Sequence, residues 1–252
     1  MHGLEGKVAV VTGGGSGIGR STAIAFAAEG TKVVVADIAV DGGEQTVQII
    51  QDSGFESIFV KTDVTRADEV ENMVDKAVET YGRLDFAFNN AGVEGDIASV
   101  TRYSEENWDQ VINTNLKSVW LCMKYEIPQM RKQGSGSIVN MSSTAGLTGV
   151  GPNPAYVGSK HGVIGLTKAA ALNYAKSGIR VNAVCPSAIH TPLVKHLIDA
   201  YPDMEKVVVG TNPMARLGTP EEVAQAVVWL CSDAASFING HPLSIDGGLL
   251  AQ

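Results

Sequence analysis

The chain has 252 residues, of which 44% are hydrophobic and 18% are charged, so it can bury a sizeable core and is not a disordered chain. Its formal net charge of -8 argues against nucleic acid or an anionic membrane surface as the main partner. No apolar run approaches the length of about 18 residues that a membrane-spanning helix needs.

The N-terminus and the cysteines indicate the compartment. Met1–Lys7 leads directly into an apolar run, without the charged and then apolar pattern of an export signal. Cys122, Cys185 and Cys231 form neither an even disulfide set nor a metal-ligand spacing. We interpret them as small buried residues, and the sequence predicts a cytoplasmic α/β protein.

Short β-branched runs alternate with longer segments whose apolar residues recur at helical spacing. This alternation predicts a parallel sheet with helices on both faces, in one doubly wound Rossmann-type α/β domain over residues 1–252. The clearest helical segments are Gly17–Glu29, Arg66–Tyr81 and Pro154–Lys176. The expected strands are Lys7–Thr12, Lys32–Asp37, Ser57–Lys61, Leu84–Asn89, Ser137–Met141, Arg180–Cys185 and His241–Ile245.

The first strand ends in a glycine-rich loop, Thr12–Gly19, which is followed directly by a helix. The usual dinucleotide pattern, with glycines at n, n+2 and n+5, is absent; Gly13, Gly17 and Gly19 give Gly-x-x-x-Gly-x-Gly. This spacing still allows a tight turn, a close approach of the backbone to a pyrophosphate, and a helix N-terminus facing it. The loop predicts a dinucleotide site; a plain strand-to-helix turn is the alternative.

Asp37 stands at the end of the second strand. A carboxylate there accepts hydrogen bonds from both ribose hydroxyls and repels a 2′-phosphate, whereas the alternative interpretation is a turn or helix cap. Ser16 and Ile38 supply no cation for such a phosphate, and Arg20 reaches it only by folding back. We therefore expect NAD rather than NADP.

Tyr156 is followed one helical turn later by Lys160, and Asn153-Pro154 predicts the start of that helix. A phenol has an ordinary pKa near 10, which is too high for a base at neutral pH. An ammonium about 4 Å away favours the phenolate by ~4 kcal/mol before desolvation opposes it. The pair predicts an acid/base device; a solvated surface pair is the alternative.

Ser142 and Ser143 follow the fifth strand, at the carboxyl edge where a doubly wound sheet presents its site. A hydroxyl there donates to a substrate oxygen as charge develops on it. No Gly-x-Ser-x-Gly surrounds these serines, which argues against a hydrolase triad. His161 faces about 100° around the helix from Lys160, so we expect a packing or surface role for it. Since no cluster has metal-ligand spacing, we expect no metal.

An irregular stretch, residues 187–213, follows the sixth strand. Its place beyond the carboxyl end of a strand predicts a mobile segment that covers the substrate, and a plain loop with a short helix is the alternative. His190 and His196 lie within it as candidate substrate contacts. The candidates for the pocket wall are Ala145, Val150, Asn153, His190, Leu193 and Leu197.

These motifs together resemble the short-chain dehydrogenase/reductase family. The resemblance implies a nicotinamide cofactor and a seven-stranded sheet in the order 3-2-1-4-5-6-7. It covers nearly the whole chain, through Arg216-Leu217-Gly218 and Asp246-Gly247-Gly248. The residues that carry it are Thr12-Gly13-x-x-x-Gly17-Ile18-Gly19, Asn89-Asn90-Ala91-Gly92, Ser143 and Tyr156-x-x-x-Lys160.

By this resemblance, Asp63 and Val64 hold the adenine, Asn90-Ala91-Gly92 lines the adenosine ribose, and Ile189 and Thr191 contact the nicotinamide amide. The family usually has Pro-Gly after the sixth strand, where this chain has Pro186-Ser187, so the backbone beside the nicotinamide can differ. The full expected cofactor set is Gly13, Ser16, Gly17, Ile18, Gly19, Asp37, Asp63, Val64, Asn90, Ala91, Gly92, Tyr156, Lys160, Ile189 and Thr191.

The resemblance also assigns catalytic roles. Ser143, rather than Ser142, binds the substrate oxygen, Tyr156 exchanges its proton, and Lys160 lowers the tyrosine pKa and holds the nicotinamide ribose. Asn115 bends its helix and holds a water beside the lysine, with Asn113 as the competing candidate by position.

The expected function is reversible NAD-linked oxidation of a secondary alcohol to a ketone. The resemblance implies a homotetramer built through the long helices and the C-terminal segment Phe237–Gln252. A ketoacyl-thioester reductase uses the same residues, but it favours NADPH and a basic docking surface. A cofactor-binding protein without turnover is the alternative from another class.

Overall fold

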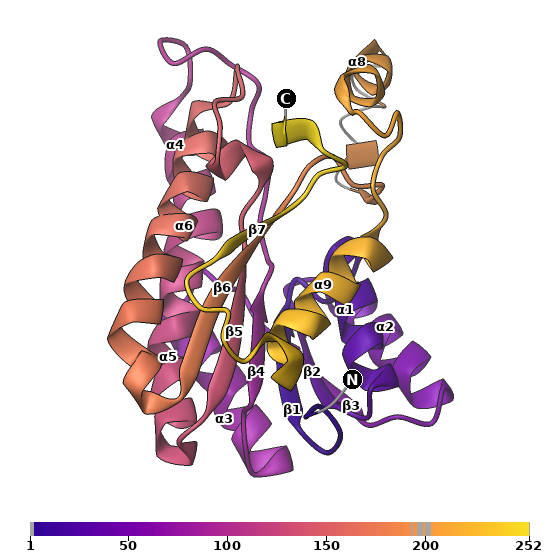
Figure 1. Ribbon diagram of the computed structural model, residues 1–252, viewed down its shortest axis with the longest axis vertical. Coiled ribbons are helices and arrows are strands. Elements are labelled where there is room, and N and C mark those ends of the chain that lie inside the picture. The colour runs from indigo at the N-terminus through magenta and orange to yellow at the C-terminus, as the bar shows by residue number, and fades with distance from the viewer. Residues whose placement is uncertain (1–2, 193, 196–198, 200–202, 252) are drawn as a thin grey trace.

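One parallel sheet organises residues 3–192, 194–195, 199 and 203–251, the part of the chain that the computed structural model describes (Figure 1). The sheet has seven strands in the order β3-β2-β1-β4-β5-β6-β7, as expected, and every strand pair is parallel. The expected strand bounds hold to within two residues. The strands are β1 (Val8–Thr12), β2 (Lys32–Asp37), β3 (Ser57–Lys61), β4 (Phe86–Asn89), β5 (Gly136–Met141), β6 (Ile179–Pro186) and β7 (Pro242–Ile245).

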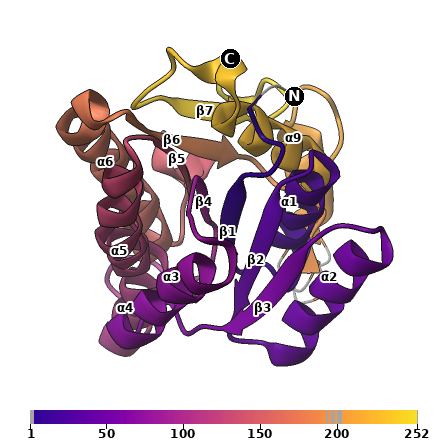
Figure 2. The ribbon, with the colours of Figure 1, turned by 90° about the horizontal axis from the view of Figure 1, so that it is seen from below.

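Helices cover both faces of the sheet, as the view from below shows (Figure 2). On one face lie α1 (Gly17–Ala28), α2 (Val40–Asp52) and α9 (Pro220–Cys231). On the other face lie α3 (Ala67–Tyr81), α4 (Glu105–Ile112), α5 (Ser118–Gln133) and α6 (Pro154–Tyr174).

Alternate residues of the central strands pack into two hydrophobic cores, one on each face of the sheet. In β2, Val33 and Val35 pack into the core on the α1 and α9 side, whereas Val34 packs into the core on the α3, α5 and α6 side. This is the two-residue period of a strand that is buried on both faces. The continuous apolar run that predicted the strand therefore follows from its two cores.

Beyond the carboxyl end of β6, α8 (Asp203–Thr211) stands at the top of the view, apart from the sheet (Figure 1). It belongs to the stretch 187–213 that we expected to cover the substrate. Within that stretch, Leu193, His196 and Leu197 lie outside the described residues.

Two further expectations concern burial. Cys122, Cys185 and Cys231 are free thiols and all are buried, as interpreted from the sequence. Among the described helices, none combines the length and the apolar character needed to cross a membrane.

Candidate active site

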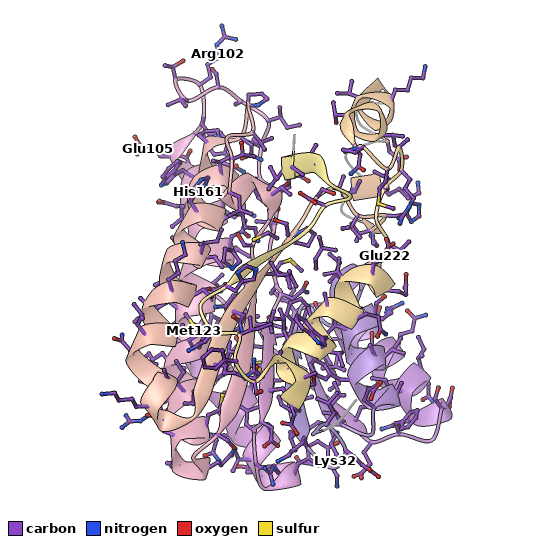
Figure 3. All side chains as sticks on the ribbon, viewed as in Figure 1. Lys32, Arg102, Glu105, Met123, His161 and Glu222 are labelled. Carbon is purple, nitrogen blue, oxygen red and sulfur yellow. The ribbon has the colours of Figure 1, made fainter. Side chains whose placement is uncertain are left out.

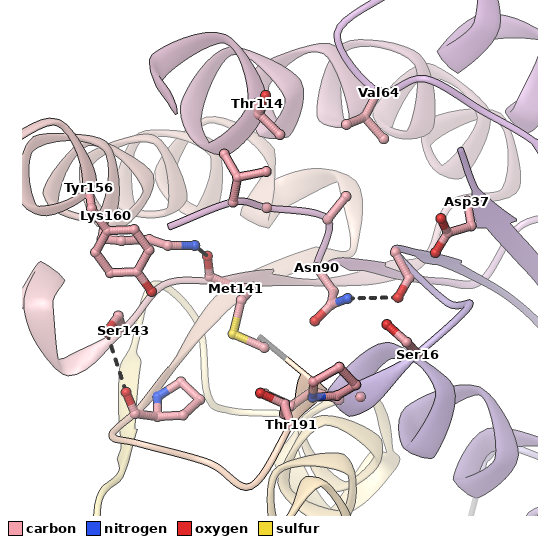
Figure 4. A pocket seen from close by; sticks show the side chains of 18 of the residues that line it. Ser16, Asp37, Val64, Asn90, Thr114, Met141, Ser143, Tyr156, Lys160 and Thr191 are labelled. Carbon is pink, nitrogen blue, oxygen red and sulfur yellow. Dashed lines mark hydrogen bonds between the residues drawn. The ribbon is translucent and has the colours of Figure 1, made fainter. Parts of the chain in front are cut away.

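A cavity of about 560 Å³ opens at the carboxyl edge of the sheet, where the loops after the strands converge (Figure 4). All but two of the residues predicted for the cofactor and for catalysis line it. Of these two, Gly19 lies beneath the glycine loop and Asn115 behind the loop that follows β4. The predicted residues in the lining are Gly13, Ser16, Gly17, Ile18, Asp37, Asp63, Val64, Asn90, Ala91, Gly92, Ser143, Tyr156, Lys160, Ile189 and Thr191.

The glycine loop needs its glycines for two separate reasons. Gly13 and Gly17 have positive φ angles of 62° and 50°, a backbone conformation that side chains disfavour. A Cβ at Gly19 would lie 2.0 Å from the carbonyl oxygen of Gly13, so α1 can approach the loop only without a side chain there. The Asn90 side-chain amide holds the same loop, donating to the carbonyl of Thr12 at 2.9 Å and to that of Gly13 at 3.2 Å.

Asp37 is fixed at the far end of this loop. Its Oδ2 accepts from the Gly15 amide at 2.8 Å, and its Oδ1 accepts from the Ala39 amide at 2.9 Å. Each oxygen retains acceptor capacity, since a carboxylate has about four lone-pair sites. The carboxylate is therefore held in place at the rim of the cavity while it can still accept further bonds.

Arg20 does fold back toward this end of the cavity. Its guanidinium, however, donates to the carbonyls of Gly15 and Gly42 and to the side chains of Gln45 and Thr46. Among the described residues no ion pair joins Arg20 to a carboxylate. The Arg20 guanidinium thus links the glycine loop to α2 through hydrogen bonds.

Asp63, which the resemblance assigns to the adenine, is also held by local bonds. Its Oδ1 accepts from the amide and the hydroxyl of Thr65, at 2.9 and 2.7 Å, and its own amide donates to Glu69 at 2.8 Å. Val64 lies beside it in the lining. The loop after β3 is thus ordered by its own side chains.

Tyr156, Lys160 and Ser143 come together at the opposite end of the cavity from Asp37 (Figure 4). Lys160 is 3% exposed; its Nζ donates to the Met141 carbonyl at 3.0 Å and lies 5.4 Å from the centre of the Tyr156 ring. Ser143 accepts from the Ala145 amide at 3.1 Å, and its hydroxyl is 3.5 Å from the Pro186 carbonyl. The loop after β5 therefore supplies Ser143, and α6 supplies both Tyr156 and Lys160.

The pKa values at this end correct our estimate from the sequence. Burial raises the pKa of Tyr156 to about 12, although its hydrogen bond with Ser143 opposes the rise. Burial also lowers the pKa of Lys160 to about 8. Desolvation is the largest cause of both shifts, and in the protein alone the pKa of Tyr156 stays above its ordinary value. Each charged form needs a partner charge that offsets its burial.

The first turn of α6 is joined to the loop after β4. The Asn153 side chain caps the helix by accepting from the Tyr156 amide at 3.2 Å, as expected, and donates to the Glu94 carbonyl at 2.8 Å. Burial raises the pKa of the Glu94 carboxyl, and the Glu94 charge in turn raises that of Tyr156. Sequence reasoning missed Glu94, since nothing in its local pattern separates it from a loop residue.

Asn115 lies in a π-helical turn, Asn113–Lys117, between α4 and α5, where the resemblance implied a bend. Its side chain is fully buried and bridges the Val93 backbone, accepting from the amide at 2.8 Å and donating to the carbonyl at 2.7 Å. Asn113 is only partly buried. Of the two candidates, Asn115 is the one that joins the helix to the cavity wall.

Other candidates fall elsewhere. Ala145, Val150, Asn153 and His190 are not among the described residues that line the cavity. His161 is exposed on α6, where Figure 3 labels it, and bonds the Val157 carbonyl of its own helix, as a surface role requires. Residues that line the cavity but lacked a sequence signal include Thr62, Val93, Gln110, Thr114 and Met141.

The stretch after β6 begins by crossing to the glycine loop. Thr191 lies so close that a Cβ at Gly17 would be 3.3 Å from its methyl group. Ile189 pairs with Gly218 in an isolated bridge, which ties this stretch to the segment before α9. Pro186 and Ser187, the departure noted in the sequence, both line the cavity.

A protein-family model described as Enoyl-(Acyl carrier protein) reductase matches residues 13–250. Cyclohexanol dehydrogenase of Acinetobacter sp. (strain SE19) is 45% identical over 249 residues, covering 99% of this chain and 97% of that protein. The 2,5-dichloro-2,5-cyclohexadiene-1,4-diol dehydrogenase of Sphingobium indicum is 42% identical over 252 residues and 100% of both. The chain belongs to the short-chain dehydrogenase/reductase family. The crystal structure of levodione reductase has the same fold, with a TM-score of 0.94 at 37% identity over 98% of both chains.

As a short-chain dehydrogenase/reductase, the protein is an oxidoreductase that acts on CH–OH groups with a nicotinamide cofactor. The cavity fits such a cofactor on its own geometry. The glycine loop has no space for side chains at Gly13 and Gly19, so that backbone amides at the start of α1 remain open to a pyrophosphate. Among the described residues no group of three or more His, Cys, Asp or Glu side chains is placed to hold a metal ion.

Proposed function

We propose that the protein transfers a hydride between NAD(H) and a secondary alcohol or ketone carried on a six-membered carbon ring. The convergence of Tyr156, Lys160 and Ser143 at one end of the cavity, with Asp37 at the other, is the observation that carries this proposal. The ring is supported by the two dehydrogenases above, whose names specify cyclohexanol and a cyclohexadiene diol.

In the proposed reaction the Ser143 hydroxyl donates to the substrate oxygen and orients it toward Tyr156. Tyr156 takes the hydroxyl proton during oxidation and returns it during reduction. Lys160, held by the Met141 carbonyl, faces the tyrosine ring and supplies a positive charge beside the phenolate. A nicotinamide cofactor, which the glycine loop and Asp37 would hold, would supply the hydride donor or acceptor and, in its oxidised form, a further positive charge. Asn115 completes the relay from the lysine toward water.

We propose NAD over NADP because of the charges at the adenosine end. The Asp37 carboxylate is held by two backbone amides and stays at the rim, where it accepts from ribose hydroxyls and repels a 2′-phosphate. The Arg20 guanidinium is committed to carbonyls and neutral side chains. Asp63, Val64 and the loop after β4 complete the proposed contacts with the adenosine.

Residues 187–213 are proposed to cover the substrate within a single domain of residues 1–252. Two contacts support this role: Thr191 lies against Gly17 across the cavity, and Pro192 and Val194 line it. Ile189 and Thr191 then lie beside the nicotinamide amide. Deleting residues from α8 should raise KM for the alcohol far more than Kd for NADH, as measured by steady-state kinetics and by fluorescence titration.

The proposed assembly is a cytoplasmic homotetramer. Apolar side chains are exposed on the elements that the family resemblance assigns to the interfaces, the long helices and the segment Phe237–Gln252: Trp120 on α5, Leu172 on α6 and Phe237 before β7. The buried free thiols suit a reducing compartment. Sedimentation analysis should give the mass of four chains, and a monomer would contradict the assembly.

The direct test is a panel of secondary alcohols with NAD⁺, followed by the absorbance of NADH. We expect turnover of cyclohexanol or a ring diol. Reduction of a ketoacyl thioester with NADPH, and of no ring ketone, would favour the acyl-thioester reductase. Tight NADH binding without turnover of any alcohol or ketone would favour a protein that only binds the cofactor.

A further inference from the structure

Glu126 is a carboxyl group inside the protein that the proposed mechanism does not use. It lies on α5, is 0% exposed, and is followed by the buried residues Ile127 and Met130. None of the ion pairs in the described part of the chain includes it. A carboxylate without a counter-charge is very costly at such a place.

Hydrogen bonds join Glu126 to the strand ends beneath the cavity. The side-chain amide of Asn89, the last residue of β4, donates to Glu126 Oε2 at 3.1 Å and to Asn140 Oδ1 at 3.0 Å. The Asn140 amide on β5 donates in turn to the Thr167 hydroxyl on α6, at 3.0 Å. One polar chain therefore crosses α5, β4, β5 and α6.

Two atoms of this chain lack partners. Throughout the described residues, the buried side-chain oxygens and nitrogens without a hydrogen-bond partner are Asn89 Oδ1 and Glu126 Oε1. They belong to two groups that are already bonded to each other. As long as Glu126 is ionised, both atoms can only accept, and neither can satisfy the other. A proton on Oε1 makes it a donor, and a carboxylic acid matches a carboxamide with two parallel bonds.

We propose that Glu126 is protonated in the native protein and closes two hydrogen bonds with Asn89, which makes it a positioning residue for Lys160. The protonation stands by itself, whereas the positioning role rests on the proposed function of Lys160.

The surroundings favour the neutral acid. Burial raises the pKa of Glu126 to about 8, and the Asn89 bond opposes the rise. The titratable group beside it is the Cys122 thiol, one turn earlier on α5, whose pKa is itself raised by burial and by the Glu126 charge. From β4, β5 and α6 the facing groups are neutral: Asn89, Asn140 and Thr167. Met123 lies beside the Asn140 amide and is labelled in Figure 3.

Two residues of this hydrogen-bonded chain, Asn89 and Asn140, directly precede residues that hold parts of the active site. Asn89 precedes Asn90, whose side chain holds the glycine loop. Asn140 precedes Met141, whose carbonyl accepts from Lys160. Fixing the side chains of Asn89 and Asn140 therefore fixes the backbone from which the cofactor loop and the lysine are held.

Infrared spectroscopy tests the proton directly. The wild-type protein at pH 7 should show the carbonyl band of a neutral, buried carboxylic acid, and Glu126→Gln should lack it. Glu71→Gln, at an exposed glutamate of α3, is the matched control and should leave the band unchanged. A wild-type spectrum with ionised carboxylates only would overturn the proposal.

Stability gives a second test. Between the ordinary glutamate pKa and about 8 the unfolded chain is ionised and the native protein is protonated, so stability falls as pH rises. The folding equilibrium constant of wild type relative to Glu126→Gln should fall about tenfold per pH unit from about pH 5.5 to 7.5. The Gln variant keeps both bonds to Asn89. A pH-independent ratio would contradict a protonated Glu126.

The positioning role is tested by cofactor binding, which needs no turnover. Glu126→Leu should weaken NADH binding at least several-fold, whereas Glu126→Gln should bind as wild type does. In active preparations the ratio of wild-type kcat to Glu126→Gln kcat should be constant below pH 7 and fall above about pH 8. Equal NADH affinity in the Leu and Gln variants, with a flat kcat ratio, would contradict the positioning role while leaving the infrared result intact. Absence of turnover in the wild type would contradict only the proposed function.

Discussion

The two ends of the cavity are formed by different kinds of chemical group. At the end proposed to bind the adenosine, glycines and backbone amides shape the surface, and Asp37 is fixed by the Gly15 and Ala39 amides at the rim. At the catalytic end, ionisable side chains are enclosed, with the pKa of Tyr156 raised to about 12 and that of Lys160 lowered to about 8. The Asp37 end is thus defined by backbone geometry, whereas the Tyr156 end is defined by ionisable groups whose pKa values are shifted by burial.

This difference decides how each end responds to substitution. If the proposed function holds, a change at the Asp37 end should alter which cofactor fits, because the groups proposed to recognise the cofactor are fixed by the main chain. A change at the catalytic end alters a proton equilibrium, because burial amplifies the effect of each neighbouring charge. The expected effects below separate these two kinds of response.

The largest effect is expected from Tyr156→Phe, which removes the proposed acid/base. Turnover should fall at least ~100-fold, as is typical for the loss of such a group, while NADH binding and unfolding stay close to wild type. Tyr174→Phe makes the same change at the other end of α6 and is the matched control. Turnover of the Tyr156 variant within a few-fold of wild type would rule out the assignment.

Lys160→Met should act on the proton equilibrium and on the cofactor together. Alcohol oxidation needs the phenolate, so its rate rises with pH. Removing the ammonium disfavours the phenolate and should move that rise upward by about one pH unit or more. The pH dependence of kcat measures the shift, and NADH titration measures the weaker binding. If NADH binding weakens while the pH dependence of kcat stays unchanged, the lysine only binds the ribose.

Glu94→Gln should have a smaller effect in the opposite direction. The Glu94 charge raises the pKa of Tyr156, so its removal should move the rise in oxidation rate to lower pH, by less than the shift in Lys160→Met. Glu71→Gln, exposed on α3, removes one charge far from the cavity as a control. If the two glutamine variants have the same pH profile, the Glu94 charge does not act on the tyrosine.

The fold could be predicted almost entirely from the sequence. Strands such as β2 are buried on both faces, so that their apolar run is continuous and hard to mistake. The order of the strands came from the family resemblance, since periodicity alone does not specify which strands are neighbours. The expected strand start at Leu84 lies two residues before the first residue of β4, Phe86, although the Asp85 amide still donates to the Val8 carbonyl at 2.9 Å.

The residues predicted for the adenosine lie together in one cavity, because glycine spacing and a carboxylate at a strand end are local signals. The sequence also predicted that Ser143, Tyr156 and Lys160 come together, but it did not predict their pKa values. The estimate from the sequence included the attraction between the Lys160 ammonium and the Tyr156 phenolate but no desolvation. In the protein alone, burial raises the pKa of Tyr156 instead of lowering it, and it lowers the pKa of Lys160. Glu94, Glu126 and Thr114 carry no motif, since only tertiary packing brings them to the cavity or beneath it. A lone glutamate among the apolar residues of α5 was a signal that sequence reasoning could have used.

The central claim is that the fixed carboxylate of Asp37 selects the cofactor while the buried tyrosine performs the proton transfer. Steady-state kinetics with NAD⁺ and NADP⁺ on one active alcohol test it most directly, in wild type and in Asp37→Ser with Ile38→Arg. Wild type should prefer NAD⁺ at least ~100-fold in kcat/KM, and the double variant should shrink or reverse that ratio without changing the pH profile of oxidation. Equal efficiency of the two cofactors with the wild-type protein would contradict the account.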